Sequence, residues 1–124
     1  MDDPKDLGAA IKDYIKKNHE SINDFLNTVM AKHMKEVGFG SVISLKKYIS
    51  EVAAGRLYGT TSAKGKNEQN LMRLSILLWY SDIDANHEII EGIKKYDPRF
   101  HYPPKGYEKN NSQENPGGLE SRTT

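Results

Sequence analysis

The chain has 124 residues, 36% of them hydrophobic, which suits one domain with a modest core and some chain left outside it. Eighteen Lys and Arg against seventeen Asp and Glu give a formal charge of +1, so any electrostatic function must rest on a local cluster. The lack of cysteine excludes disulfides, thiolate chemistry and zinc sites of the cysteine type. With no apolar signal segment and no run of about 18 apolar residues, the sequence predicts a soluble, cytoplasmic protein.

Two amphipathic helices are expected at the start of the chain. Between Pro4 and Asn18 the apolar residues form a one-sided stripe that follows several aspartates, the charge that a helix N-terminus favours. The segment 21–38 carries a longer stripe, beginning at the capping residue Ser21 and stopping at Gly38. The pattern therefore predicts one continuous helix over this segment.

A third helix should follow, capped by Ser41 or Ser44 and closed by Gly55 or Gly59. Its inner stripe would be formed by Leu45, Tyr48, Ile49, Val52 and Leu57. Its outward residues would be Lys46, Lys47, Ser50, Glu51 and Ala54.

The stretch "LMRLSILLWYSDI", which begins at Leu71, is apolar on almost every side of the helical wheel. Such a helix belongs at the centre of a fold or in a subunit interface. Self-association would then use the following residues of this helix: Met72, Ile76, Trp79 and Tyr80. The preceding residues, 60–70, show no periodicity and predict an exposed connector.

A last helix, capped by Asp84, should end at Pro98. Beyond it the composition turns to Pro, Gly and polar residues, so residues 99–124 are predicted to be a mostly disordered tail after a helical domain of residues 1–98. No segment has the pattern of a strand. The predicted fold is therefore all-α, a compact bundle of about five helices with a disordered C-terminal tail.

No catalytic or metal-binding motif stands out. His87 and Glu91 share a helical face but lack a third ligand at a diagnostic spacing, and His33 lies on an apolar stripe, as a hydrogen-bonded structural histidine would. Phosphate-binding loops, nucleophile elbows and zinc-protease signatures are all missing from the sequence. The sequence thus predicts no enzyme, no metal site and no cofactor.

Basic residues gather between Ser44 and Arg73, where six Lys and Arg face two Glu. On the third helix they would reach a DNA groove, and in the following loop they would reach the phosphate backbone. The predicted nucleic-acid contacts are Ser44, Lys46, Lys47, Ser50, Arg56, Lys64 and Lys66.

Three stretches resemble lambda-repressor-type helix-turn-helix regulators. "LGAAIKDYIKKNHESI" is similar to that family's opening helix, "ISEVAAGRLY" to the end of its recognition helix, and "LMRLSILLWYSDID" to its fourth, core helix. The likeness covers roughly residues 7–84. It implies an all-α DNA-binding domain whose second helix has been extended by about two turns.

Three functions are consistent with these patterns. The first is a small DNA-binding transcriptional regulator acting as a dimer, because one short recognition helix buries too little surface for specificity. The second is a helical protein-interaction or assembly module in which the apolar helix and exposed Met30, Met34 or Phe39 bind another chain. The third is a membrane-surface or matrix-like protein whose basic loop contacts anionic lipid.

Overall fold

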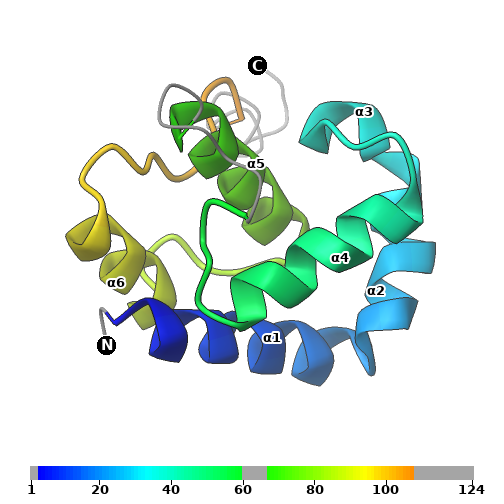
Figure 1. Cartoon of the computed structure of the whole chain (residues 1–124), viewed down its shortest axis with the longest axis horizontal. Coiled ribbons are helices and arrows are strands. Elements are labelled where there is room, and N and C mark those ends of the chain that lie inside the picture. Colours follow the sequence, from blue (N-terminus) through cyan, green and yellow to red (C-terminus); the bar gives the residue numbers. More distant parts are fainter. Residues whose placement is uncertain (1–2, 60–66, 108–124) are drawn as a thin grey trace, which may run out of the picture.

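The structure is a computed structural model that describes residues 3–59 and 67–107 (Figure 1). The elements in chain order are α1 Pro4–His19, α2 Ile22–Thr28, the 3-10 helix η1 Met30–Lys32, α3 Met34–Val37, α4 Val42–Ala53, α5 Asn67–Tyr80 and α6 Glu88–Tyr96. Within the described ranges there is no strand, which confirms the predicted all-α fold.

Helix α1 begins where the sequence predicts. Asp3 caps it by accepting a hydrogen bond of 2.8 Å from the amide of Lys5, and Pro4 starts the first turn, where a missing N–H costs nothing. Leu7, Ile11 and Ile15 are at most 1% exposed. In Figure 1, α1 runs along the lower side of the bundle with α4 packed across it, α2 at one end and α6 at the other.

The predicted continuous helix over residues 21–38 is wrong, and so is the extended second helix of the resemblance. The chain instead forms three short pieces, α2, η1 and α3. The hydroxyl of Thr28 donates to the carbonyl of Asp24 at 2.5 Å, a local bond that bends helices, and β-branched Val29 follows it. The bent path lets Phe25, Met30 and Val37 all be fully buried.

Helix α4 agrees with its prediction. The hydroxyl oxygen of Ser41 accepts from the amide of Ser44 at 3.1 Å and caps the helix. The predicted inner stripe, including Leu57 beyond the helix end, is buried throughout. The opposite side of α4 faces solvent.

Helix α5 lies at the centre of the fold, one of the two positions predicted for it. Leu74, Leu77 and Leu78 have no exposed surface, and every residue from Asn70 to Ser81 is buried or half-buried. The all-round apolar pattern is therefore satisfied within this chain.

The predicted domain boundary at Pro98 falls too early. Phe100 and Tyr102 are 4% and 7% exposed and belong to the core, and the hydroxyl of Tyr102 donates to the carbonyl of Ile83 at 2.9 Å. Large aromatic side chains bury enough apolar surface to hold a segment that has no regular structure. The domain thus includes residues 99–107, and the rest of the predicted tail, 108–124, lies outside the described residues.

Helix α6 is capped by His87 instead of Asp84. The Nδ1 atom of His87 accepts from the amide of Ile89 at 3.1 Å, and its ring packs edge-on against Tyr14. Asp84 accepts from the amide of Asn86 in the preceding turn. The side chain of His87 is therefore a helix cap that also packs against Tyr14.

Candidate functional site

Most of the nucleic-acid contacts predicted from the sequence lie on the outward face of α4. Its exposed residues, hereafter the α4 face, are Ile43, Ser44, Lys46, Lys47 and Ser50. The helix beneath them is fixed by its cap and by the buried stripe on its other side. The α4 face is thus a set of solvent-facing side chains on a rigid support, as a contact surface requires.

Ile43 is the residue of this face that the sequence reading missed. Its side chain is 81% exposed, the highest value for a large hydrophobic residue in the described ranges. Ile43, Lys47, Ser50 and Ala54 follow one another at intervals of four, three and four, so helical spacing places Ile43 on the outward line. That spacing was the available signal, but the sequence analysis assigned Ile43 to neither the inner stripe nor the outward side.

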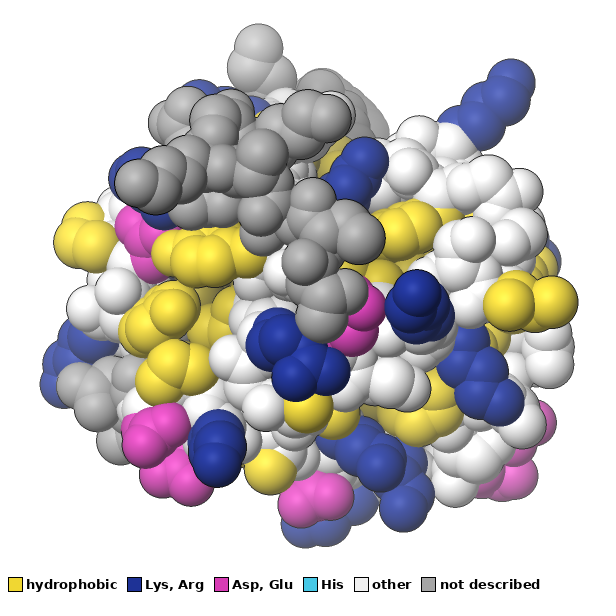
Figure 2. Space-filling view, in the orientation of Figure 1, with side chains coloured by type: hydrophobic (Ala, Val, Ile, Leu, Met, Phe, Trp, Pro, Cys, Tyr) yellow, Lys and Arg dark blue, Asp and Glu magenta, His cyan; other side chains and the backbone are white. Residues whose placement is uncertain are grey.

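The basic side chains on and beside this surface have no acidic partner among the described residues. Lys46, Lys47 and Arg56 make no ion pair within residues 3–59 and 67–107. Lys12 of α1 lies with Lys46 along a groove of about 230 Å³ between the two helices, whose remaining lining is Ile22, Ile49, Ser50 and Ala53. Figure 2 shows dark-blue side chains distributed over α4 and α1, with magenta side chains near the centre and along the lower edge of the molecule.

A second hollow, of about 190 Å³, borders the α4 face near the N-terminal half of α5. We call it the Arg73 hollow; it is lined by Phe39, Ser44, Lys47, Tyr48, Glu51, Tyr58, Gly59, Asn70 and Arg73. The Nη1 atom of Arg73 donates to Oδ1 of Asn70 at 3.0 Å, and the guanidinium lies 5.2 Å from the centre of the Phe39 ring. Burial raises the pKa of Tyr48 well above its ordinary value, so this phenol stays neutral.

The structure brings five of the seven predicted contacts to the outside of the molecule. Four lie on the α4 face and Arg56 is exposed just beyond the helix end. Lys64 and Lys66 lie outside the described residues. Arg73, which the sequence reading counted only as part of the local charge, is half-buried in the hollow next to the predicted set.

The predicted interface residues are covered largely by their own chain. Ile76 is 6% exposed, and the half-buried Trp79 has its ring centre 5.5 Å from that of Tyr107 and 6.3 Å from that of Tyr102. Tyr80 stacks on His33 at 3.9 Å, and Met72 is half-buried. Met30, offered by the sequence as an exposed partner-binding residue, is fully buried, because the bend after α2 turns it into the core.

Hydrogen bonds to the carboxylate of Glu36 join α3, α5 and the C-terminal segment. Glu36 accepts hydrogen bonds from the hydroxyls of Tyr80 and Tyr107 and contacts Nδ1 of His33 at 2.7 Å. Burial raises the pKa of Glu36, but the hydrogen bonds from Tyr107, Tyr80 and His33 together hold it below the ordinary value. His33 is therefore half-buried and hydrogen-bonded, as its position on the apolar stripe predicted.

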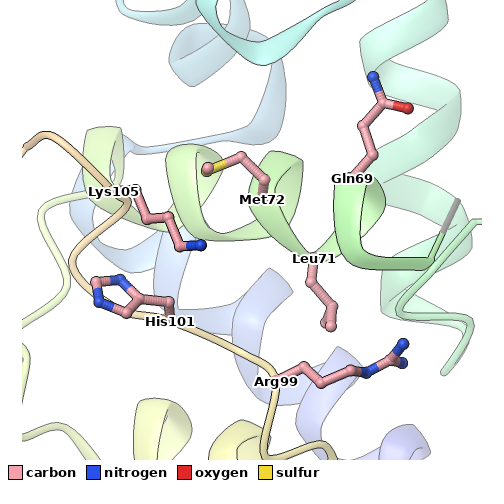
Figure 3. Close-up of a pocket in the computed structure, with 6 residues that line it drawn as sticks. All are labelled: Gln69, Leu71, Met72, Arg99, His101 and Lys105. Carbon is pink, nitrogen blue, oxygen red and sulfur yellow. The ribbon is translucent and has the colours of Figure 1, made fainter.

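Another hollow, of about 320 Å³, lies between α5 and the C-terminal segment. Figure 3 shows Gln69, Leu71 and Met72 from α5 on one side, with side chains of the segment 99–105 facing them. The guanidinium of Arg99 is engaged by Asp97, with Nη2 to Oδ2 at 2.5 Å. Because the charge of Arg99 is compensated, Lys105 is the cation lining this hollow that makes no ion pair within residues 3–59 and 67–107.

Among the described residues, no group of three His, Cys, Asp or Glu side chains is arranged to hold a metal ion. In the same part of the chain, every helix is too short or too polar to cross a bilayer. Comparison of the chain with protein-family models, with curated proteins and with solved structures gives no match.

Proposed function

We propose that this protein binds DNA through the α4 face and acts as a small, dimeric transcriptional regulator. The observation that carries the proposal is the α4 face itself, where uncompensated lysines and short hydroxyl side chains stand on a helix whose other side is buried. Lysines neutralise phosphates, and Ser hydroxyls donate to or accept from base edges.

The exposed position of Ile43 is consistent with the same role. An apolar side chain at the start of a recognition helix can contact the methyl group of thymine in the major groove. Removing an apolar side chain from water is favourable, so burial of Ile43 against a partner increases the affinity for that partner. Lys46 and Lys47, one turn further along, would lie beside the phosphates that flank the contacted bases.

The approach to α4 also supports this proposal. The four residues 38–41 connect α3 to α4 and include two glycines, and Gly38 has a positive φ of 82°. Helix-turn-helix units use short, glycine-containing turns of this kind before the helix that enters the groove. A dimer is part of the proposal because one helix of 12 residues covers too little DNA for useful specificity.

Salt dependence provides the main test. We expect random duplex DNA to bind at low salt, with a linear loss of affinity against log salt. Changing both Lys46 and Lys47 to Gln should reduce the slope by about two, roughly one for each phosphate that is no longer neutralised. Lys94→Gln with Lys95→Gln on α6 is the matched control, because it removes the same charge from another surface and should leave the slope unchanged.

Two results would contradict the proposal: no binding by the unmodified protein at low salt, or equal slopes for the two double variants. Protein docking is the second candidate function, and the 81% exposure of Ile43 is the observation that favours it. The Ile43→Ser variant separates the two. Under DNA binding it changes sequence preference and keeps the salt slope, whereas under docking no DNA affinity exists to change.

A further inference from the structure

We infer that the Arg73 hollow binds one phosphate group, which in the complex proposed above is a phosphate of the DNA backbone beside α4. The inference rests on the proposed function for the source of the phosphate. The chemistry of the hollow supports it separately, because four of the described side chains that line it have donors left for a ligand: Ser44, Lys47, Asn70 and Arg73.

The guanidinium of Arg73 is held in place without a carboxylate. Asn70 accepts one of its N–H groups, the Phe39 ring lies beside it, and a side chain at Gly38 would come within 3.2 Å of its Nε atom. No acidic residue of the described chain forms an ion pair with Arg73. A guanidinium has five N–H groups in a planar fork that matches the oxygens of a phosphate, so a positioned and unpaired Arg is suited to bind one.

Asn70 provides a second donor, and it is buried. Asn70 is only 5% exposed. Its Oδ1 atom accepts a hydrogen bond from Arg73, so the amide nitrogen is the side-chain atom that remains to bind another group. This nitrogen has no acceptor within residues 3–59 and 67–107. Buried donors are normally satisfied, so an acceptor entering the hollow would remove an existing cost.

Ser44 and Lys47 bring two further donors from α4. The hydroxyl of Ser41 donates to the Ser44 oxygen at 3.0 Å, so the proton of Ser44 remains available for an incoming oxygen. Lys47 also lines the hollow and adds an ammonium group that makes no ion pair with the described residues. Since both residues also belong to the α4 face, a phosphate in the hollow would be continuous with a nucleic acid lying along α4.

Glu51 also lines the hollow and opposes an anion. Among the described lining residues the cations Arg73 and Lys47 outnumber this carboxylate, which favours a single phosphate group over a densely charged ligand. Glu51→Gln should therefore strengthen phosphate binding. This prediction distinguishes an anion site from a hollow that merely happens to contain an Arg.

Two variants test the site with the full chain, after circular dichroism has shown that they fold. Arg73→Lys keeps the charge but removes the planar fork, so DNA affinity should fall about fivefold or more with little change in salt slope. Lys47→Gln on the exposed rim should reduce the slope by about one. Lys95→Gln on α6 is the control and should match the unmodified protein.

Inorganic phosphate is the second probe, added at constant ionic strength while the side-chain N–H signals of Arg73 and Asn70 are followed by NMR. We expect both signals to shift, and Arg73→Lys to abolish the shift at Asn70. If DNA binds but Arg73→Lys keeps its affinity within twofold of the unmodified protein and phosphate shifts neither signal, the inference fails and the proposed function stands. If no DNA binds but phosphate shifts both signals, the proposed function fails and the hollow binds a free phosphate. If phosphate shifts neither signal and Arg73→Lys does not change DNA affinity, the site does not exist.

Discussion

The crossing of α1 over α4 makes Gly8→Ala the most informative stability test. A Cβ atom at Gly8 would lie 2.0 Å from the carbonyl oxygen of Val52 and 3.1 Å from that of Ala53, whereas ordinary van der Waals contact begins at 3.4 Å. The groups in the way are backbone atoms of a helix, so they cannot move aside as a side chain would. The two helices must separate by about an ångström or more at a point where the neighbouring Leu7 and Val52 are at most 1% exposed.

Two effects of opposite sign decide the outcome. Replacing Gly by Ala within a helix contributes about 0.5 to 1 kcal/mol of stability, while overpacking a well-filled core costs about 1 to 3 kcal/mol. We expect the second to prevail, with a net loss of about 1 to 2 kcal/mol, or very roughly 4 to 15 °C in melting temperature for a domain of this size. Urea unfolding followed by circular dichroism measures it.

The neighbouring exposed residue supplies the calibration. Ala9→Gly in the same helix should lose about 1 kcal/mol through helix propensity alone, because Ala9 does not take part in the crossing. If propensity were the only effect, Gly8→Ala would gain what Ala9→Gly loses. A Gly8→Ala protein as stable as the unmodified one, or more stable, would show that α1 and α4 do not meet at this distance.

Other predictions concern the core and the acid response. Phe100→Ala should cost about 3 to 5 kcal/mol in urea unfolding, against less than about 1 kcal/mol for Tyr96→Ala, which is 37% exposed; equal small costs would place residues 99–107 outside the domain. Leu77→Ala should cost about 2 to 5 kcal/mol, and a loss below about 1 kcal/mol would contradict the central position of α5. Hydrogen bonds from Arg99 hold the pKa of Asp97 below its ordinary range, so the stability that this carboxylate contributes is present above about pH 4 and is lost as the pH falls. Between pH 7 and pH 3 the Asp97→Asn variant should therefore lose less stability than the unmodified protein. Equal losses would refute the pairing of Asp97 with Arg99.

Much of the fold was predictable because local signals and burial agree. The cap at Ser41 and the inner stripe of α4 are set by residues close together in the sequence, and both were predicted correctly. The cap of α6 was not, since Asp84 and His87 both stand before the helix and only the turn between them determines which side chain reaches an amide. The boundary after Pro98 was missed because Phe100 and Tyr102 gain their burial from residues distant in sequence.

The candidate site was predictable only in part. Helical spacing predicted the outward lysines and serines of α4, whereas Ile43 was assigned to neither side of the helix although its side chain is exposed. Arg73 and Asn70 were beyond sequence reasoning, because their places depend on a turn more than 30 residues earlier in the chain. The periodicity of apolar residues carries no information about contacts between segments that are distant in sequence.

The break in the segment 21–38 links the failed helix prediction to the Arg73 hollow. A continuous helix of 18 residues would be about 27 Å long and would carry Gly38 and Phe39 away from the bundle in a straight line. The bend after α2 instead returns the chain to α5, where Glu36 is held by Tyr80 and Tyr107. That return places Phe39 against the guanidinium of Arg73, so the wall of the hollow depends on the same long-range contacts that override the local helical pattern.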